Sequence, residues 1–458
     1  MDKKHVHFIG IGGYGMSAIA RVLLDLGMKV SGSDVAENVL VQKLMERGAQ
    51  VTIGHHQSNI EGADIVVYSS SIDPENVEIV AARSNDIEVL HRSQMLARLL
   101  NNQIGIAVAG AHGKTTTSSM IAQTMEICGA DPTYIIGGEV IGLKGNAKAG
   151  KSKYVVAEAD ESDGTFLEYF PHYAIVTNIE PDHLENYGGD FENLKKAYRE
   201  FLSQVRTEGT AILCWDDAYV RDMAEEVRGN YITYGIDHPA DYRATEIQEK
   251  YREVSFTVMK DEQKLGEVRL QTNGRHNISN ALAVVVVCLE IGLPFADIAS
   301  SLYEFQGSKR RFQVIGEVNQ VLVIDDYAHH PTEIRATLSG AKALNRPVKV
   351  VFQPQRYSRT HLLMEEFSCA FHDADEVMIN TIYAPPGEKP IPGVSSERLT
   401  ELIRKNSNHN ARFIGTKEEL IEYLRSDLQP GDVVITMGAG DIWRVAYQLV
   451  EALKKQGE

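Results

Sequence analysis

The sequence predicts an α/β protein of three domains: a Rossmann-like N-terminal domain, a central P-loop ATPase-type domain with a mostly parallel sheet, and a Rossmann-like C-terminal domain. Three observations predict this class. Short apolar segments alternate with amphipathic ones along the chain, as in βα units that build parallel sheets. Glycine-rich turns at residues 10–15 and 110–113 each follow an apolar segment and precede a helical one. The length of 458 residues suits about three domains.

Each expected element follows from this alternation. The expected strands are 5–11, 29–34, 64–70 and 87–91 in a first domain (1–102), 103–110, 154–160 and 173–180 in a second (103–312), and 321–327, 348–354, 376–380 and 432–438 in a third (313–458). Amphipathic or apolar spacing predicts helices at 15–27, 94–102, near 191–204 and within 276–304. Alternating polar and apolar residues at 240–272 predict antiparallel strands appended to the second sheet.

Composition excludes several classes of function. The net charge of −17 disfavours nucleic acid as a partner, because an acidic surface repels phosphate backbones. The four cysteines are widely spaced, so neither a zinc site nor a disulfide framework is indicated. The most apolar stretch, 280–294, contains Glu290 and is too short to span a bilayer. The first residues lack the pattern of a signal peptide. We therefore expect a cytoplasmic protein without membrane insertion.

The first glycine-rich turn has the spelling of a dinucleotide-binding loop. It reads GIGGYGMS after a strand, and an acidic residue stands at the end of the next strand. The residues concerned are Gly12, Gly13, Tyr14, Gly15, Met16, Ser17 and Asp34. The pattern encodes a tight turn and a helix N-terminus that faces a diphosphate. Alone, it leaves open whether the ligand is a nicotinamide dinucleotide or another diphosphate.

The second turn, GAHGKTTT at 110–117, resembles a nucleotide-binding P-loop. Gly110 and Gly113 leave the backbone free to point amides at phosphate oxygens, Lys114 can neutralise phosphates, and Thr115 can ligate Mg²⁺. The strict pattern expects a glycine where this chain has Val108. The alternative is a glycine-capped turn with threonines on a helix surface, and nucleotide binding is favoured.

Acidic residues and a histidine follow the next two expected strands. They are Glu158, Asp160, Glu161 and Asp163 after one strand, and Glu180, Asp182 and His183 after the other. The carboxyl ends of parallel strands meet at one edge of a sheet, where ligands gather. Carboxylates beside a P-loop suit Mg²⁺, although some of these residues can equally belong to a solvated loop. His183 has two interpretations, as a metal ligand or as a substrate contact.

Further polar strings occur in the second half of the chain. In GRHNISNA (274–281), Asn277 and Ser279 could cap a helix. Lys309, Arg310 and Arg311 form either an anion site or a solvated basic patch. Asp325, Asp326, Tyr327, His329 and His330 follow a strand, Arg356 and Arg359 follow another, and Gly438 and Gly440 form a third glycine-rich turn.

Taken in order, these strings resemble the Mur ligases of peptidoglycan synthesis. The matching strings are GIGGYGMS, GAHGKTTT, AEADESDG, NIEPDHLENY, GRHNISNA, KRRFQ, DDYAHHPTE, VFQPQRYSRT and GDVVITMGAGDIW. They extend over the whole chain, and they are most similar to the family members that add L-alanine to UDP-N-acetylmuramic acid. The resemblance implies an ATP- and Mg²⁺-dependent reaction in which the lactyl carboxylate is phosphorylated and the amine of L-alanine attacks the acyl phosphate.

The resemblance also implies roles for individual residues. It gives ATP the residues Gly110, Ala111, His112, Gly113, Lys114, Thr115, Thr116, His276, Asn277, Arg310, Arg311 and Asp326. It implies that Thr115, Glu158 and His183 bind the metal. It also implies that the UDP-sugar and the amino acid are bound by the first glycine-rich loop, Asp34, Ser70, Ser71 and Tyr327. The implied catalytic residues are Lys114, Glu158, His183, His329 and Arg356.

Alternatives remain at this point. One is a recycling ligase that attaches a whole murein peptide, another is an NAD(P)-binding oxidoreductase, and a third is a regulatory ATP-binding protein without catalysis. A site divided over three domains is expected to need domain closure, which also keeps water from an acyl phosphate. A monomer or weak homodimer is expected.

Overall fold

The computed structural model describes residues 4–143, 145–162, 164–227, 229–250, 253–272, 274–307, 309–384 and 388–456. The chain folds into two compact units. Unit 1 comprises 1–247, 255–270 and 278–306, and unit 2 comprises 248–254, 271–277 and 307–458. Within the described residues the strands form three sheets, which confirms the predicted α/β class, while the boundaries near 102 and 312 stay a prediction.

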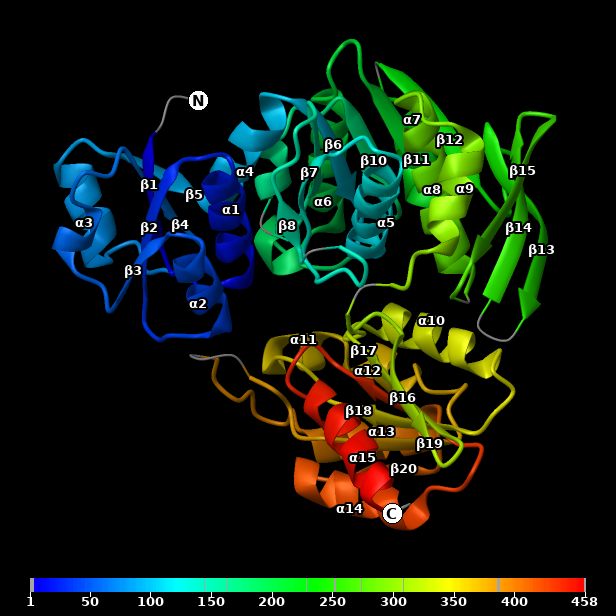
Figure 1. Ribbon diagram of the computed structural model, residues 1–458. Coiled ribbons are helices and arrows are strands. Elements are labelled where there is room, and N and C mark those ends of the chain that lie inside the picture. The colour runs from blue at the N-terminus through cyan, green and yellow to red at the C-terminus, as the bar shows by residue number, and fades with distance from the viewer. Residues whose placement is uncertain are drawn as a thin grey trace. The chain divides into compact units, whose positions relative to one another are not determined.

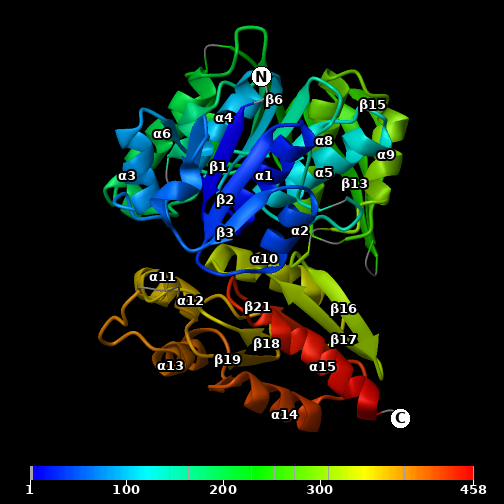
Figure 2. The ribbon, with the colours of Figure 1, turned by 60° about the vertical axis from the view of Figure 1, so that its left-hand side comes forward.

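The first sheet, in unit 1, is parallel and has the strand order β3-β2-β1-β4-β5. Its elements are β1 (His5–Ile9), α1 (Tyr14–Asp25), β2 (Lys29–Asp34), α2 (Val39–Glu46), β3 (Gln50–Ile53), η1 (Gln57–Ile60), β4 (Ile65–Tyr68), α3 (Val77–Ser84), β5 (Glu88–His91) and α4 (Arg92–Asn101). Helix α3 covers one face, and α1 and α2 cover the other (Figures 1 and 2). The edge strand β3 was not predicted, because its residues are mostly exposed and give little apolar signal.

The second sheet has the order β15-β14-β13-β12-β11-β10-β6-β9-β7-β8. Its strands are β6 (Ile104–Ala109), β7 (Thr133–Ile135), β8 (Ala147–Lys148), β9 (Tyr154–Glu158), β10 (Tyr173–Val176), β11 (Thr210–Cys214), β12 (Asn230–Gly235), β13 (Tyr242–Lys250), β14 (Glu253–Lys260) and β15 (Gln263–Leu270). The helices are α5 (Lys114–Ile127), η2 (Thr165–Glu168), η3 (Leu184–Tyr187), α6 (Phe191–Ser203), α7 (Ala218–Ala224), α8 (Arg275–Glu290) and α9 (Phe295–Tyr303).

Strand order explains where ligand-binding groups gather in this sheet. β6 pairs in parallel with β10 on one side and with β9 on the other. The turn after β6 therefore lies between the carboxyl ends of β9 and β10, as the sequence predicted. The predicted appended strands at 240–272 are confirmed as β13–β15 (Figure 1). β14 and β15 are neighbours joined by two residues, a connection that only antiparallel strands allow.

The third sheet, in unit 2, has the order β16-β17-β21-β18-β19-β20. Its elements are β16 (Gln313–Val318), β17 (Val321–Asp326), α10 (Pro331–Lys342), β18 (Val348–Phe352), α11 (Tyr357–Leu362), α12 (Met364–Ser368), β19 (Glu376–Ile379), α13 (Ser396–Asn406), β20 (Ala411–Phe413), α14 (Lys417–Asp427), β21 (Val433–Met437) and α15 (Trp443–Gln456). β16 is antiparallel to β17, and the other pairs are parallel. Separate apolar cores on the two faces show that the sheet is covered on both sides.

In the part of the chain that the structure describes, no helix combines the length and the apolar character needed to cross a bilayer.

Candidate active site

The first glycine-rich loop follows β1 and is held by the end of β2. The carbonyl of Ser33 accepts a hydrogen bond from the amide of Gly10 at 2.8 Å. Asp34 Oδ2 accepts one from the amide of Gly12, also at 2.8 Å. Because α1 begins at Tyr14, its first amides face the loop, an arrangement that suits a diphosphate. The predicted residues Gly12, Gly13, Tyr14, Gly15, Met16, Ser17 and Asp34 thus form one continuous structure.

The segments that follow β4 and β5 lie at the same edge of the sheet as this loop. Ser70 Oγ lies 3.0 Å from His91 Nε2, and Ser71 lies in an exposed turn. A Cβ atom on Gly15 would lie 2.8 Å from Nη1 of Arg92, so this arginine packs against the loop. Sequence reasoning missed Arg92. The available signal was a basic residue directly after a strand whose carboxyl end joins the same edge, and a guanidinium suits phosphate.

The P-loop follows β6, and both of its glycines are required. Gly110 has a φ of +138° and Gly113 a φ of +87°, in the left-handed region that favours glycine. A Cβ on Gly110 would lie 2.0 Å from Thr177 Oγ1, and one on Gly113 would lie 2.7 Å from Asn280 Oδ1. The loop is therefore fitted closely against the residue that follows β10 and against α8.

The segment after β10 fixes the P-loop backbone. The carbonyl of Asn178 accepts from the amide of Ala111 at 3.1 Å, and its side-chain Oδ1 accepts from the amide of His112 at 2.8 Å. Thr177 Oγ1 donates to the carbonyl of His112 at 2.6 Å. Thr177 and Asn178 belong to the string that carries Glu180, but the sequence did not reveal their supporting role.

Lys114, at the start of α5, is folded back onto its own loop. Its Nζ donates to both carboxylate oxygens of Glu161 at 2.8 Å and to the carbonyl of Gly110 at 2.6 Å. Burial opposes the charge, but the carboxylates of Glu161 and Asp160 together raise the pKa of Lys114 above its ordinary value. The ammonium is therefore charged, and binding a phosphate requires it to leave Glu161.

Thr115 and Glu158, predicted as metal ligands, lie side by side. Thr115 Oγ1 is 3.2 Å from Glu158 Oε2, and the amide of Gly137 donates to Glu158 Oε1 at 2.6 Å. Burial raises the pKa of Glu158, although Gly137 and Lys114 act in the opposite direction. A buried carboxylate that lacks full compensation, next to a hydroxyl, offers the hard oxygen ligands that Mg²⁺ prefers. Thr116 is the next residue of α5.

His183 lies on the neighbouring loop, after β10. It has a φ of +55°, a strained value for a non-glycine residue, and precedes η3. Its Nε2 is 3.5 Å from Asp182 Oδ2. The pKa of Asp160 is lowered against the effect of burial, by Lys114, Ser162 and His183. The metal role of His183 stays a prediction, and Asp163 lies outside the described residues.

In unit 2, the side chain of Arg310 is hydrogen-bonded to the third glycine-rich turn, which contains Gly438 and Gly440. Its Nε donates to Asp325 Oδ2 at 3.1 Å, its Nη1 to the carbonyl of Gly440 at 3.2 Å, and its Nη2 to the carbonyl of Gly438. Both arginines lie over the ring of Tyr327, Arg310 at 4.8 Å and Arg311 at 5.3 Å from the ring centroid, and Arg311 Nη1 is 3.5 Å from Glu333 Oε1.

Asp326, predicted to reach ATP, makes local contacts. Its Oδ2 accepts from the amide of Phe312 at 2.6 Å and its Oδ1 from the amide of Ala328 at 2.7 Å. Burial raises its pKa, and Arg311 and these amides act against that shift. The carboxylate thus shapes the turn after β17, and its contact with ATP stays a prediction.

Asp325 is expected to titrate near neutral pH. Burial raises its pKa to about 6 despite the opposing charge of Arg310. The stability that this carboxyl contributes is therefore full below pH ~4, its unfolded pKa, and is lost as pH rises through about 6. Carbon-13 spectra of aspartate-labelled protein, assigned with an Asp325→Asn variant, should show this titration. A midpoint below pH ~4.5 would contradict the prediction.

His329 is a neutral histidine with a defined tautomer. Its Nδ1 lies 3.0 Å from the carbonyl of Tyr327 and 3.3 Å from Glu333 Oε2, so Nδ1 carries the proton. Burial lowers its pKa to about 4; Glu333 opposes this shift, while Arg359 adds to it. The ring of Tyr327 stands edge-on to the imidazole, with centroids 5.2 Å apart. Unprotonated Nε2 is therefore available as an acceptor at neutral pH.

Arg356 begins α11 with a strained backbone. Its φ is +66°, and its amide donates to the carbonyl of Tyr383 at 2.9 Å. Within the described ranges its exposed side chain has no hydrogen-bond or ion-pair partner. Strain of this kind in a non-glycine residue is found where a loop is held for function. The predicted amino-acid-side residues Tyr327 and His329 are brought together, whereas Arg356 is not placed against them by any contact.

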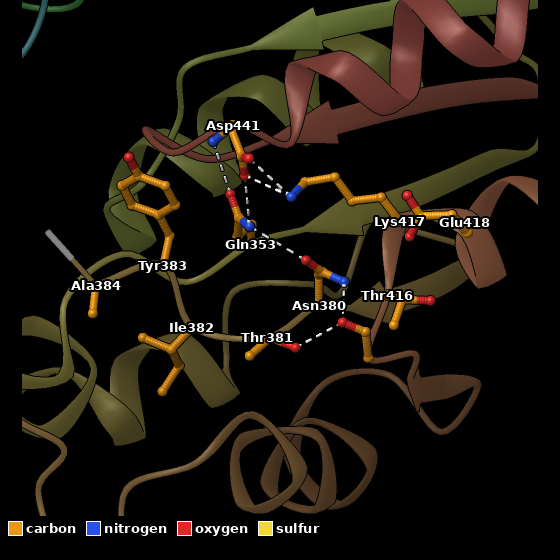
Figure 3. Close-up of a pocket in the computed structure, with 11 residues that line it drawn as sticks. Gln353, Asn380, Thr381, Ile382, Tyr383, Ala384, Thr416, Lys417, Glu418 and Asp441 are labelled. Atoms are coloured by element: carbon orange, nitrogen blue, oxygen red, sulfur yellow. Dashed lines mark hydrogen bonds and ion pairs between the residues drawn. The ribbon is translucent and has the colours of Figure 1, made fainter. Parts of the chain in front are cut away.

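A polar cavity of about 380 Å³ adjoins this loop within unit 2 (Figure 3). Gln353 bridges Asp441 and Asn380 in its wall, with 3.3 Å contacts to both, and Lys417 donates to Asp441 Oδ2 at 2.9 Å. Tyr383 covers Gly440, where a Cβ would lie 2.7 Å from its Cγ. Hydrogen bonds among Gln353, Asn380, Asp441 and Lys417 hold this wall of the cavity together.

The predicted adenine-side residues open α8. His276 and Asn277 are its second and third residues, and Asn277 Nδ2 lies 3.2 Å from Thr272 Oγ1. Because α8 begins at Arg275, neither Asn277 nor Ser279 is its N-cap, and the capping alternative was wrong.

Family models match almost the entire chain. The Mur ligase family, catalytic domain, matches residues 5–104. The Mur ligase middle domain matches 108–288, and the Mur ligase, glutamate ligase domain matches 310–440.

Individual relatives agree with these matches. The UDP-N-acetylmuramate–L-alanine ligase of Symbiobacterium thermophilum is 49% identical over 100% of this chain and 96% of its own length. That of Geotalea daltonii is 46% identical over 99% of this chain and 98% of its own. The solved UDP-N-acetylmuramate–alanine ligase of Thermotoga maritima has a TM-score of 0.81 at 29% identity, covering 99% of this chain and 100% of that one. A murein peptide ligase from Psychrobacter arcticus gives 0.69 at 25% identity, covering 98% of both chains. With three family models covering nearly all of its length and relatives aligned from end to end, this chain belongs to the Mur ligase family.

Proposed function

We propose that this chain is an ATP-dependent ligase that joins L-alanine to the lactyl carboxylate of UDP-N-acetylmuramic acid in peptidoglycan precursor synthesis. The observation that carries the proposal is the P-loop with Lys114 and the adjacent Thr115–Glu158 pair, in a chain 49% identical over its whole length to a ligase of that name. A diphosphate loop in the same unit supplies a place for the UDP end.

The reaction divides into two transfers. A carboxylate oxygen of the sugar attacks the γ-phosphorus of ATP, an O–P bond forms, and ADP leaves. The amine of L-alanine then attacks the acyl carbon, and the tetrahedral intermediate collapses to amide and inorganic phosphate while the amine loses a proton. Both steps need charge stabilisation and positioning. The first amides of α5 and the ammonium of Lys114 are the groups proposed to bind the transferred phosphoryl.

The residues present fit a magnesium ion. Thr115 and Glu158 would hold it, with His183 as a further ligand or substrate contact. When bound, the ion neutralises charge between ATP and the substrate carboxylate. The carboxylate of Glu158 is buried with a raised pKa, and a cation would remove the cost of that buried charge.

We propose roles in binding the amino acid and ATP for residues of unit 2 as well. Of the two adjacent arginines, Arg311 is the better candidate for ATP, because all three guanidinium nitrogens of Arg310 already hold Asp325 and the glycine turn. His276, Asn277 and Asp326 are proposed for the nucleotide. Tyr327, His329 and Arg356 are proposed for L-alanine.

His329 is expected to accept a hydrogen from the amine of L-alanine through Nε2. His329→Asn keeps a donor toward the Tyr327 carbonyl but lacks the acceptor, whereas His329→Gln places an oxygen near the Nε2 position. We expect His329→Asn to lower kcat/KM for alanine about 10²-fold and His329→Gln to lower it less, with the KM for ATP unchanged. Steady-state kinetics with varied alanine measure this. Equal losses in both variants would contradict the acceptor role.

Phosphate release with purified protein, ATP, Mg²⁺ and UDP-N-acetylmuramic acid across a panel of amino acids tests the function. Release that depends on both the sugar and alanine supports the proposal. ATP turnover without dependence on the sugar, or NADH binding followed by fluorescence, would overturn it. The panel also shows how strictly alanine is preferred over glycine and serine.

The alternative within the family is a recycling ligase. A solved relative from Neisseria meningitidis is described as a ligase of UDP-N-acetylmuramate and L-alanyl-γ-D-glutamyl-meso-diaminopimelate, at 27% identity over 67% of this chain. Adding that tripeptide to the panel separates the two activities. Preference for the tripeptide over alanine would favour recycling. We further propose a cytoplasmic location. We also propose a monomer or weak homodimer, and sedimentation of the purified chain measures this oligomeric state.

A further inference from the structure

A buried hydrogen-bonded chain lies under the first glycine-rich loop, on the face of the first sheet that α3 covers. His5 and His7 point to this face from β1, Ser31 and Ser33 from β2, and Glu78 from α3. Apolar residues fill the opposite face, where Val6 and Phe8 are buried. The His7 and Glu78 side chains are only 1% and 0% exposed. So large a polar group in a sheet core is unusual and costs stability unless every contact is satisfied.

The contacts form an unbroken series. His5 Nδ1 lies 2.7 Å from the carbonyl of Gly62, and His5 Nε2 lies 2.7 Å from Ser31 Oγ. Ser31 Oγ lies 2.8 Å from His7 Nδ1, and His7 Nε2 lies 2.9 Å from Glu78 Oε2. A serine hydroxyl has one proton, and each of these short contacts needs one proton between its two atoms.

Counting protons shows that this series of hydrogen bonds needs one proton more than two neutral histidines, the Ser31 hydroxyl and the carboxylate of Glu78 supply. The carbonyl of Gly62 requires a proton on His5 Nδ1, and the carboxylate of Glu78 requires one on His7 Nε2. If both rings are neutral, their other nitrogens are both acceptors, and the single Ser31 proton satisfies only one of them. One ring must therefore be doubly protonated for every contact to be made.

The extra proton belongs on His7. Glu78 Oε1 accepts from Asn59 Nδ2 at 2.7 Å and from the amide of His56 at 3.1 Å, and its Oε2 accepts from Ser33 Oγ at 2.7 Å. Three donors besides His7 keep Glu78 a carboxylate, and these hydrogen bonds lower its pKa although burial opposes this. His7 is the histidine of the series in direct contact with this carboxylate, so the extra proton is placed on His7.

The charges near His5 give the same answer. Burial lowers the pKa of His5, and nearby Lys29 acts in the same direction, with only Gly62 and Asp64 opposing. Another titratable neighbour of Glu78 is His55, whose Nδ1 is 3.6 Å from Glu78 Oε1. His5 is therefore neutral, and the imidazolium and the carboxylate are adjacent.

Ser33 connects this ion pair to the loop. Its carbonyl accepts from the amides of Gly10 at 2.8 Å and Ile11 at 3.0 Å. Its hydroxyl is used toward Glu78, so the 3.0 Å contact with His55 Nδ1 requires a proton on that nitrogen. His55 follows Gly54, whose amide donates to the carbonyl of Asp34 at 2.8 Å.

We propose that Glu78, with the imidazolium of His7 and the hydroxyl of Ser33, is a positioning residue for the first glycine-rich loop and so for the diphosphate end of the substrate. This rests on the proposed function only in taking that loop as the site of the UDP-sugar. Glu78 does not touch the substrate. It fixes Ser33, whose carbonyl sets the backbone of Gly10 and Ile11, and it fixes the tautomer of His55.

Histidine nitrogen spectra of the full chain test the proton count. Long-range proton–nitrogen correlation at pH 7 should show both ring nitrogens of His7 protonated, His5 protonated at Nδ1 only, and a proton on Nδ1 of His55. Assignment uses His5→Gln, His7→Gln and His55→Gln variants. If neither His5 nor His7 is doubly protonated, the assigned network is overturned.

Binding of UDP, measured by calorimetry, tests the positioning role. Ser33→Ala removes the contacts of one hydroxyl, with Glu78 and with His55, and is the mildest variant, while Glu78→Gln keeps the shape and removes the charge. We expect both to weaken UDP binding about 10-fold and to raise the KM for the UDP-sugar, with kcat and the KM for ATP unchanged. Ser84→Ala, an exposed serine on the same helix that bonds only its own helix backbone, is the matched control and should bind UDP as the parent does.

The outcomes separate the two proposals. If the parent chain does not bind UDP, the proposed function fails at this loop. If the parent binds UDP and both variants bind it equally well, the positioning role is overturned and the function stands. Equal losses of kcat and of ATP binding would show a general loss of structure and would also overturn the positioning role.

Discussion

Replacing Lys114 by alanine is expected to lower turnover about 10³-fold, because the charge that stabilises the transferring phosphoryl group is lost. ATP binding should weaken, whereas UDP binding should not change, since the first glycine-rich loop, the proposed UDP site, is a separate structure with its own supports. Phosphate release and calorimetry with ATP and UDP measure the two effects. Near-normal turnover in Lys114→Ala would refute the phosphate role.

A structural effect must be separated from this catalytic one. Lys114 neutralises Glu161, whose side chain is only 2% exposed, so Lys114→Ala leaves a buried carboxylate without its ion-pair partner. Breaking a buried pair in this way costs about 3–5 kcal/mol. The double variant Lys114→Ala/Glu161→Gln removes that charge and should recover stability without recovering turnover. Lys148→Ala, which also breaks ion pairs with Glu126 and Asp131, is the matched control and should keep normal turnover.

The sequence predicted several of the buried strands, but it left out β11 and β7, whose residues are mostly buried, as well as strands at sheet edges. β2 agrees with the expected segment at both ends, and β6, β9 and β10 begin within one residue of theirs. β3 and β20 were not predicted, since both are short strands with little buried apolar surface. β16 follows the expected start of the third domain but pairs antiparallel with β17, a connection that an alternating βα pattern does not indicate.

Within the site, motif residues could be predicted, and their supports could not. Lys114 and Thr115 are recognisable because a P-loop requires those residue types in that order. Thr177 and Asn178 hold the same loop through one hydroxyl and one amide, and many sequences could supply such contacts. The different contacts of Arg310 and Arg311 could not be predicted from the sequence either. Neighbouring arginines look equivalent in sequence, but in the structure it is Arg310 that is bound to Asp325 and two glycine carbonyls.

Glu158→Gln should remove most activity without loss of stability, which distinguishes a metal ligand from a structural residue. Glutamine can still accept from the Gly137 amide and contact Thr115, so the shape is kept. The charge is what is lost, and we expect kcat to fall about 10²-fold and the Mg²⁺ concentration for half-maximal rate to rise about 10-fold. Phosphate release over a range of Mg²⁺ concentrations measures both.

Whether Glu158→Gln is more or less stable than the parent protein is a second part of this test. Burial raises the pKa of Glu158 above its unfolded value, so in the metal-free protein its charge opposes folding once pH exceeds the folded pKa. Without Mg²⁺, Glu158→Gln should therefore melt at the same temperature as the parent or higher at pH 7.5, and Mg²⁺ should stabilise the parent more than the variant. His183→Ala is the companion variant, and a similar rise in the Mg²⁺ requirement would identify it as a ligand. If Glu158→Gln kept the parent's Mg²⁺ dependence, the metal would have to be held elsewhere, because this variant removes the charge of Glu158 while it keeps the shape of the side chain.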